Sequence, residues 1–231
     1  MYFSHVKRLK VAEQVAGSIR DAILGGSYEP GDTLPSEREL AGRFEVNRSS
    51  VREAIHKLEA WGLVEVRHGG GTRVREFLAS AGLQLLPFLL APGGSLDPKM
   101  LMDLRDLRVG LLGWTGSRAA MRGGPEAVEP LREALQALRD ATDPGERQAL
   151  DFSFYEELVR LTDNGVASLL ANAVRQVYMQ NRELFAALYA AEPFDTTLHQ
   201  AAVDAVAAGD VEAATAAMEA YGRSVLPGGG A

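Results

Sequence analysis

Apolar residues near the start of the chain recur at spacings of three and four, as on one face of a helix. The first stripe predicts a helix over residues 11–24, which the glycines and prolines of "GGSYEPGDTLP" end. Two shorter stripes follow, each opened by the pattern Ser-x-x-Glu. This pattern favours a helix start, because its side chains satisfy backbone N–H groups that lack a partner within the helix. The two predicted starts are Ser36 with Glu39 and Ser50 with Glu53.

The pattern changes after the third stripe. Val64 and Val66 alternate with charged residues, a glycine-rich turn follows, and Val74 resumes the alternation. A period of two on either side of a turn predicts a β-hairpin. One helix, two short helices joined by a tight turn, and a hairpin together predict a winged helix-turn-helix.

The rest of the chain shows only helical periodicity. Pairs of aspartate and proline at 97–98 and 143–144 are typical helix starts, since proline suits the first helical position. Helices are predicted over roughly 98–122, 125–141, 144–161, 165–191, 194–208 and 210–226. The sequence therefore predicts a mainly α protein in three parts: a winged helix-turn-helix DNA-binding domain in residues 1–76, a linker helix in 77–97, and an all-helical effector-binding and dimerisation domain in 98–231.

Composition excludes several classes of function. The chain has no cysteine, which rules out a disulfide framework, cysteine-ligated zinc and a cysteine nucleophile. Its start carries no apolar signal core, and the run "LQLLPFLLA" is too short to span a bilayer. We expect a cytoplasmic protein with no membrane partner.

Charge is distributed unevenly. The net charge is −7, yet residues 1–76 hold 12 lysines and arginines against 11 aspartates and glutamates. The acidic excess therefore lies entirely in the second part of the chain. A near-neutral module joined to an acidic one indicates two modules with different partners.

The helix that begins near residue 48 is the candidate for DNA recognition. In a winged helix the second helix of the helix-turn-helix enters the major groove, with its N-terminal residues at the base edges. Arginine matches guanine O6 and N7, and serine hydroxyls can donate to phosphate oxygens. A solvated helix with scattered arginines explains any one of these residues alone, but their combination favours DNA contact. The candidates are Arg38, Asn47, Arg48, Ser49, Ser50 and Arg52 in the helices, with Arg67, His68 and Gly69 in the wing.

The stretch "YEPGDTLPSERELAGRFEVNRSSVREAIHKLEAWGLVEVRHGGGTRV" resembles the DNA-binding domain of GntR-family bacterial regulators. The resemblance implies a homodimer on a palindromic operator. It also implies DNA contacts at Arg38, Arg48, Ser49, Ser50, Arg52, His68 and Gly69. In some members a lysine follows the His-Gly pair of the wing; here that position is Gly70.

The helical part resembles the ligand-binding domain of the FadR branch of this family. In many members an aspartate and three histidines hold a divalent metal that binds an organic acid. The matching positions here are Asp151, Tyr155, His199 and Tyr221. Because neutral tyrosine is a weak ligand, we expect no high-affinity metal. A metal-dependent sensor of organic acids is the alternative hypothesis.

Three stretches, "ASAGLQLLPFLL", "LDFSFYEELVRLTDN" and "LHQAAVDAVAAGDVEAATAAMEAYGRS", resemble the fatty-acid-responsive FadR type. That type binds long-chain acyl-CoA without a metal, so the resemblance implies a fatty acyl-CoA, or a related lipid or organic acid, as the effector. Taken singly, each residue of the implied pocket could instead belong to a hydrogen-bonded core that contacts no effector. The implied pocket residues are Arg108, Asp151, Tyr155, Tyr178, His199, Tyr221, Gly222 and Ser224, with Arg182 or Arg223 facing a phosphate or carboxylate.

Two other classes of protein compete with a ligand-responsive regulator. "HGGG" at residues 68–71 is also the oxyanion-hole signature of certain esterases, but no G-x-S-x-G accompanies it. An architectural DNA-binding protein that binds no ligand is the second alternative, but it would give the acidic helical module no function. The sequence therefore predicts a DNA-binding transcription regulator, and not an enzyme.

Overall fold

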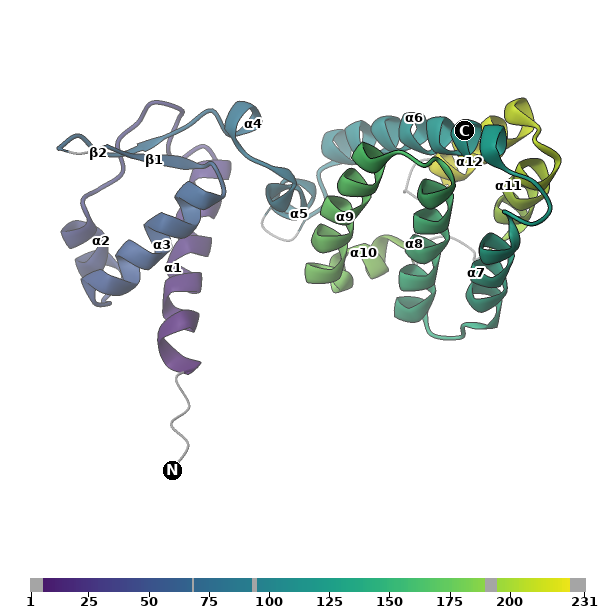
Figure 1. The fold of residues 1–231 in the computed structure, drawn as a ribbon. Coiled ribbons are helices and arrows are strands. Elements are labelled where there is room, and N and C mark those ends of the chain that lie inside the picture. Colours follow the sequence, from purple (N-terminus) through teal and green to yellow (C-terminus); the bar gives the residue numbers. More distant parts are fainter. Residues whose placement is uncertain (1–5, 68, 93–94, 190–194, 225–231) are drawn as a thin grey trace. The chain divides into compact units, whose positions relative to one another are not determined.

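The computed structural model describes residues 6–67, 69–92, 95–189 and 195–224. The chain divides into two compact units, Met1–Asp97 and Pro98–Ala231. The described part is mainly helical, with a single small antiparallel sheet, as predicted (Figure 1). No helix in that part is long and apolar enough to cross a membrane.

The first unit contains the predicted winged helix-turn-helix. The sheet pairs Val64 with Val74 at one end and Arg67 with Gly71 at the other. The first helix begins at Val6, earlier than the predicted start at residue 11. The elements are α1 (Val6–Leu24), α2 (Glu37–Arg43), α3 (Arg48–Ala60), β1 (Val64–Arg67) and β2 (Gly71–Val74).

The start of α2 agrees with the sequence, and the start of α3 does not. The hydroxyl of Ser36 accepts from the Glu39 backbone N–H, while the Glu39 carboxylate accepts from the Ser36 N–H. The predicted start of α3 at Ser50 is wrong. Asn47 caps this helix, because its Oδ1 accepts the Ser50 N–H at 2.9 Å, and asparagine is among the strongest N-caps.

The linker helix predicted over residues 77–97 is not continuous, because residues 77–90 form three short pieces that pack on the winged helix. They are α4 (Phe77–Ser80), the 3-10 turn η1 (Leu83–Leu85) and α5 (Leu86–Leu90). Leu85 is buried in the core of the first unit. The Arg20 guanidinium lies 3.6 Å from the centroid of the Phe88 ring. The centroids of the Trp61 and Phe88 rings are 6.0 Å apart. The connector is thus part of the DNA-binding unit.

The second unit is the predicted all-α bundle. Its elements are α6 (Pro98–Arg122), α7 (Glu129–Asp140), α8 (Pro144–Leu161), α9 (Gly165–Gln180), α10 (Arg182–Tyr189), α11 (Thr197–Ala208) and α12 (Val211–Ser224). The single helix predicted over 165–191 is interrupted at Asn181, whose backbone leaves the helical conformation. Asn181 turns its side-chain amide back to the Val177 carbonyl at 2.9 Å, which competes with helix continuation.

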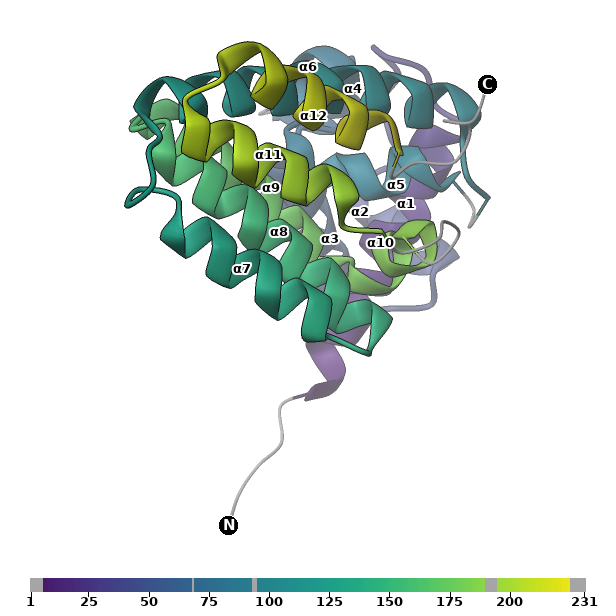
Figure 2. The ribbon, with the colours of Figure 1, turned by 90° about the vertical axis from the view of Figure 1, so that its right-hand side faces the viewer.

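Helices α6 and α12 run alongside each other with the most extensive packing of the unit (Figure 2). Glycine permits this closeness. A Cβ at Gly116 would lie 2.6 Å from the Ala214 carbonyl oxygen, and one at Gly222 would lie 2.9 Å from Cα of Val109. The core beneath is built around Phe154, which is 1% exposed. This packing sets the distance between the helices that carry the buried polar residues described below.

Candidate DNA-binding surface and effector site

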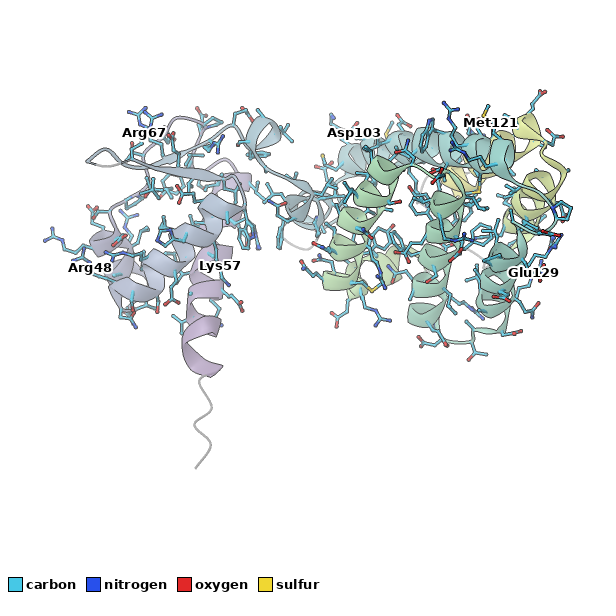
Figure 3. The ribbon with its side chains drawn as sticks, viewed as in Figure 1. Arg48, Lys57, Arg67, Asp103, Met121 and Glu129 are labelled. Carbon is cyan, nitrogen blue, oxygen red and sulfur yellow. The ribbon has the colours of Figure 1, made fainter. Side chains whose placement is uncertain are left out.

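The N-terminal end of α3 forms an exposed surface rich in arginine. The Arg48 and Arg52 side chains are 64% and 62% exposed, and Figure 3 shows Arg48 extending away from the helices. Arg38 on α2 is also exposed. The Ser49 hydroxyl donates to Asn47 Oδ1 at 2.5 Å. The structure therefore places most of the predicted helical DNA contacts at solvent.

Ser50 departs from the expected arrangement. Its side chain is buried, with 2% of the residue exposed, because it faces the core of the first unit. Its hydroxyl is therefore not displayed for a phosphate, and its backbone N–H serves the Asn47 cap instead.

The sequence interpretation overlooked Glu37, which lies between the arginines. Arg52 Nε donates to Glu37 Oε1 at 3.2 Å, and Arg52 Nη2 donates to Oε2 at 3.1 Å. Arg48 Nη2 lies 4.0 Å from the same Oε2. The hydrogen bond from Arg52 is the main reason that the pKa of Glu37 lies below its ordinary value. No local pattern would have revealed this pair, since its members belong to different helices.

The wing supplies two further exposed arginines, one at the end of β1 and one within β2. Arg67 Nη2 lies 2.9 Å from the Glu65 carboxylate on the same strand. Gly69 and Gly71 have φ angles of 74° and 77°, which favour glycine and explain part of the "HGGG" sequence as a hairpin turn. The predicted contact His68 lies outside the described residues.

The second unit encloses a polar cluster of three residues, which we call the Asp151 cluster: Asp151, His199 and Tyr221. Asp151 Oδ1 accepts a hydrogen bond from the Tyr221 hydroxyl and lies 2.7 Å from His199 Nε2. The three residues are 8%, 2% and 5% exposed. They come from α8, α11 and α12, so one carboxylate oxygen joins three helices. His199 Nδ1 is buried without a hydrogen-bond partner in the described structure.

Arg108 on α6 lies beside this cluster and among three tyrosines. Its guanidinium is 4.7 Å from the centroid of the Tyr221 ring. Burial raises the pKa of both Tyr155 and Tyr178, and the nearby Arg108 charge opposes that rise at each. A hydrogen bond with Thr115 also lowers the pKa of Tyr155, against the larger rise caused by burial. The two phenols therefore stay neutral near pH 7, facing one fixed cation.

A row of aromatic rings continues from these tyrosines. The Phe152 ring lies 5.8 Å from the Tyr155 ring and 5.5 Å from the Tyr178 ring, between centroids. Tyr178 stacks on Phe185 with centroids 4.1 Å apart. Phe185 was not among the predicted site residues; its position beside Tyr178 depends on the break at Asn181.

The other predicted effector residues do not join the cluster. Gly222 faces Val109 in the α6–α12 contact, where a side chain would clash. Arg182 is exposed and donates to the Gly145 carbonyl at 3.3 Å. Arg223 is exposed near Glu219, and the Ser224 hydroxyl donates to the Tyr221 carbonyl at 3.0 Å.

The metal implied by the resemblance to the FadR branch does not fit these residues. Asp151 Oδ1 is occupied by hydrogen bonds with protein groups, and the remaining two positions are tyrosines. Tyr155 is held neutral by its raised pKa, and a neutral phenol is a poor ligand. The described residues hold no group of three or more His, Cys, Asp and Glu side chains arranged to bind an ion. Arg108 also places a positive charge at the site, which opposes a second cation.

A winged helix that exposes arginines, joined to a helical bundle with a buried polar cluster, defines a two-domain DNA-binding regulator. The family model "Bacterial regulatory proteins, gntR family" matches residues 11–74, and the FCD domain model matches residues 103–223. The chain belongs to the GntR family and carries an FCD effector-binding domain. Its fold and relatives are those of transcription regulators and not of enzymes, which excludes the esterase alternative.

Three relatives illustrate the range of the similarity. The chain is 38% identical to Rv0494 of Mycobacterium tuberculosis, named as an uncharacterized HTH-type transcriptional regulator, covering 95% of this chain and 89% of that one. It is 30% identical to a putative L-lactate dehydrogenase operon regulatory protein of Escherichia coli, covering 92% and 83%. It is 28% identical to a fatty acid metabolism regulator protein of Erwinia tasmaniensis, covering 69% and 66%.

The fold also matches a solved structure. A GntR-family regulator from Pseudomonas syringae superposes with a TM-score of 0.51 at 21% identity, covering 92% of this chain and 81% of that one.

Proposed function

We propose that the chain acts in the cytoplasm as a homodimer on a palindromic operator, and that an organic acid or fatty acyl-CoA in its second unit lowers operator affinity. Two winged helices on successive half-sites would be spaced by about one helical turn, roughly 34 Å. By reciprocity, DNA must weaken effector binding by the same factor.

The placement of Arg108 carries the effector proposal. A guanidinium surrounded by neutral tyrosines and adjoining a row of aromatic rings suits a ligand with one anionic group and an apolar body. A fatty acyl-CoA, whose phosphates are anionic and whose chain is apolar, meets that description. The name of the Erwinia tasmaniensis relative and the resemblance to the FadR type support the same class.

A small 2-hydroxy acid such as L-lactate is the second candidate, and His199 favours it. If Nε2–H donates to Asp151, Nδ1 is an acceptor, and it is buried without a partner in the described structure. The hydroxyl of such an acid could donate to Nδ1 while its carboxylate meets Arg108. The name of the Escherichia coli relative points to this class.

The test begins with an operator found by in vitro selection from random duplex DNA with the full-length protein. Native mass spectrometry then reports the oligomeric state and any adduct. Fluorescence anisotropy with the selected operator follows release by oleoyl-CoA or L-lactate, with Arg108→Gln as the site variant and Arg118→Gln, also on α6, as its matched control. The proposal is supported if either compound releases the operator from the wild type and from Arg118→Gln but not from Arg108→Gln. A monomer, or release unaffected by Arg108→Gln, contradicts it.

A further inference from the structure

We propose that Glu37 is a specificity-determining residue of the DNA-binding surface, because it holds Arg52 in a defined orientation and attracts Arg48 before DNA arrives. The inference rests on the proposed function, binding to an operator, and on the prediction from the sequence that Arg48 and Arg52 contact base edges. Glu37 is an acidic residue on a surface that is proposed to meet DNA phosphates. Because a carboxylate repels phosphates, Glu37 cannot be explained by an increase in affinity for DNA.

The geometry is that of a planar fork on a carboxylate. Arg52 uses Nε and one N–H of Nη2 for the two oxygens of Glu37, at 3.2 and 3.1 Å, which leaves both N–H groups of Nη1 and the second N–H of Nη2 as donors on the other side. Such two-point pairing restricts the direction of the guanidinium as well as its distance. Arg48 is attracted to the same carboxylate, at 4.0 Å. One acidic residue therefore orients Arg52 and attracts Arg48.

Glu37 is the more enclosed member of the group. Its side chain is 29% exposed, against 62% for Arg52 and 64% for Arg48. It lies in the first turn of α2, where the positive end of the helix dipole favours a negative charge. The carboxylate is thus more enclosed than either arginine, and the Arg52 guanidinium is oriented against it.

This arrangement changes what the arginines can bind. An isolated exposed arginine binds any phosphate, which supplies sequence-independent affinity. Here a phosphate that approaches Arg52 also approaches the Glu37 carboxylate and is repelled. A guanine edge has no net charge, so it can accept from the outward donors without that repulsion. Glu37 therefore lowers affinity for random DNA more than for the operator.

The ordinary interpretation is a surface ion pair that contributes little to stability. The two interpretations differ in their effect on specificity. A plain charge effect would be reproduced by neutralising any nearby acid, whereas a positioning effect belongs to Glu37 alone. Glu53 supplies the matched control, since it is an exposed glutamate on α3 next to Arg52.

The experiment measures binding of the full-length protein to its selected operator and to random duplex DNA, for wild type, Glu37→Gln and Glu53→Gln. For Glu37→Gln we expect tighter binding to random DNA, a salt slope steeper by about one, and a fall of roughly tenfold in the ratio of operator to random affinity. Glu53→Gln should leave that ratio within about twofold of wild type. Repeating the selection with Glu37→Gln should return an operator motif degenerate at the base pairs that Arg48 and Arg52 read.

Two further variants separate the possible failures. If Arg52→Ala and Arg48→Ala both leave operator binding unchanged, the proposed DNA interface is wrong. If they weaken binding but Glu37→Gln keeps the wild-type ratio, the interface stands and the role of Glu37 is refuted. Should Glu37→Gln not fold, Glu37→Asp retains the charge and moves the carboxylate back by one methylene. It should lower the ratio without changing net charge, and an unchanged ratio would equally overturn the inference.

Discussion

His199 Nε2 and Asp151 Oδ1 lie 2.7 Å apart inside the second unit, although 48 residues separate them in the sequence. The Tyr221 hydroxyl donates to the same carboxylate oxygen. A buried carboxylate is costly unless its hydrogen bonds are satisfied. These contacts therefore tie α8, α11 and α12 together at the place where the resemblance implied a metal, and protein groups occupy the Oδ1 oxygen of Asp151 there.

Replacing Tyr221 with Phe tests the structural value of this hydrogen bond. The variant keeps the ring and removes one donor to a buried carboxylate, so the free energy of unfolding should fall by about 1–3 kcal/mol in urea denaturation. Tyr28→Phe, in the first unit, is the control and should change it by less than about 0.5 kcal/mol. Operator binding without effector should be retained while the effector response weakens. An unchanged response would remove Tyr221 from the effector site.

Replacing Arg48 or Arg38 with Ala tests the DNA surface. Loss of a base contact should cost about 1–3 kcal/mol in operator binding and relax the preference at one base pair. Arg132→Ala on α7, whose partner is Glu129, should alter neither quantity. Binding titrations against the operator and its single-base variants measure both. Equal weakening on every DNA would mean that these arginines contact only phosphate.

Replacing Phe88 with Ala tests whether the connector transmits the effector signal. The change removes the ring that contacts Arg20 and Trp61. Because Phe88 is only partly buried, we expect about 2 kcal/mol of destabilisation, below the loss for a fully buried phenylalanine. The operator affinity of the effector-bound and effector-free protein should become similar. Leu78→Ala, at a position 73% exposed on the same connector, should keep the full response. A full response in Phe88→Ala would assign the coupling to another segment.

Two glycines of α6 should respond oppositely to alanine. At Gly116 a methyl group would lie 2.6 Å from the Ala214 carbonyl oxygen, so Gly116→Ala should destabilise the protein by about 1–3 kcal/mol. A methyl group at Gly110 would have nothing within 4 Å, and alanine is the better helix former, so Gly110→Ala should stabilise it by about 0.5–1 kcal/mol. Thermal unfolding of the two variants measures the signs. Destabilisation of equal size at both positions would refute the close contact of α6 with α12.

Acidification should release the contact between Glu37 and Arg52. The hydrogen bond from Arg52 lowers the pKa of Glu37 below its ordinary value of 4.5. The folded state therefore binds this proton less readily than the unfolded chain does, and the contribution to stability is complete above the ordinary pKa. It is lost as the pH falls through the lower, folded pKa. Wild type should lose more stability than Glu37→Gln between about pH 6 and about pH 3. Parallel pH profiles would show that the pair contributes nothing.

Much of the winged helix could be predicted because its signals are local. The three- and four-residue spacing of its apolar residues, the Ser36–Glu39 cap and the alternation around Val64 each depend on neighbours within one or two turns. The errors were local as well. At the start of α3 two capping patterns competed, and Asn47 prevailed because Ser50 packs into the core. At Asn181 a side-chain hydrogen bond interrupts a pattern that periodicity alone reads as continuous.

The sequence by itself determined the fold class, the family and the arginines that face solvent. Only the tertiary structure decided that Glu37 lies against Arg52 and that Asp151 meets both His199 and Tyr221. The resemblance implied Asp151, His199 and Tyr221 as candidate site residues, but it did not predict the hydrogen bonds among them. Periodicity specifies which face of each helix is buried, but helix packing sets which buried polar groups meet. That packing depends on the volumes of many side chains at once, including glycines such as Gly116 that allow α6 and α12 to approach.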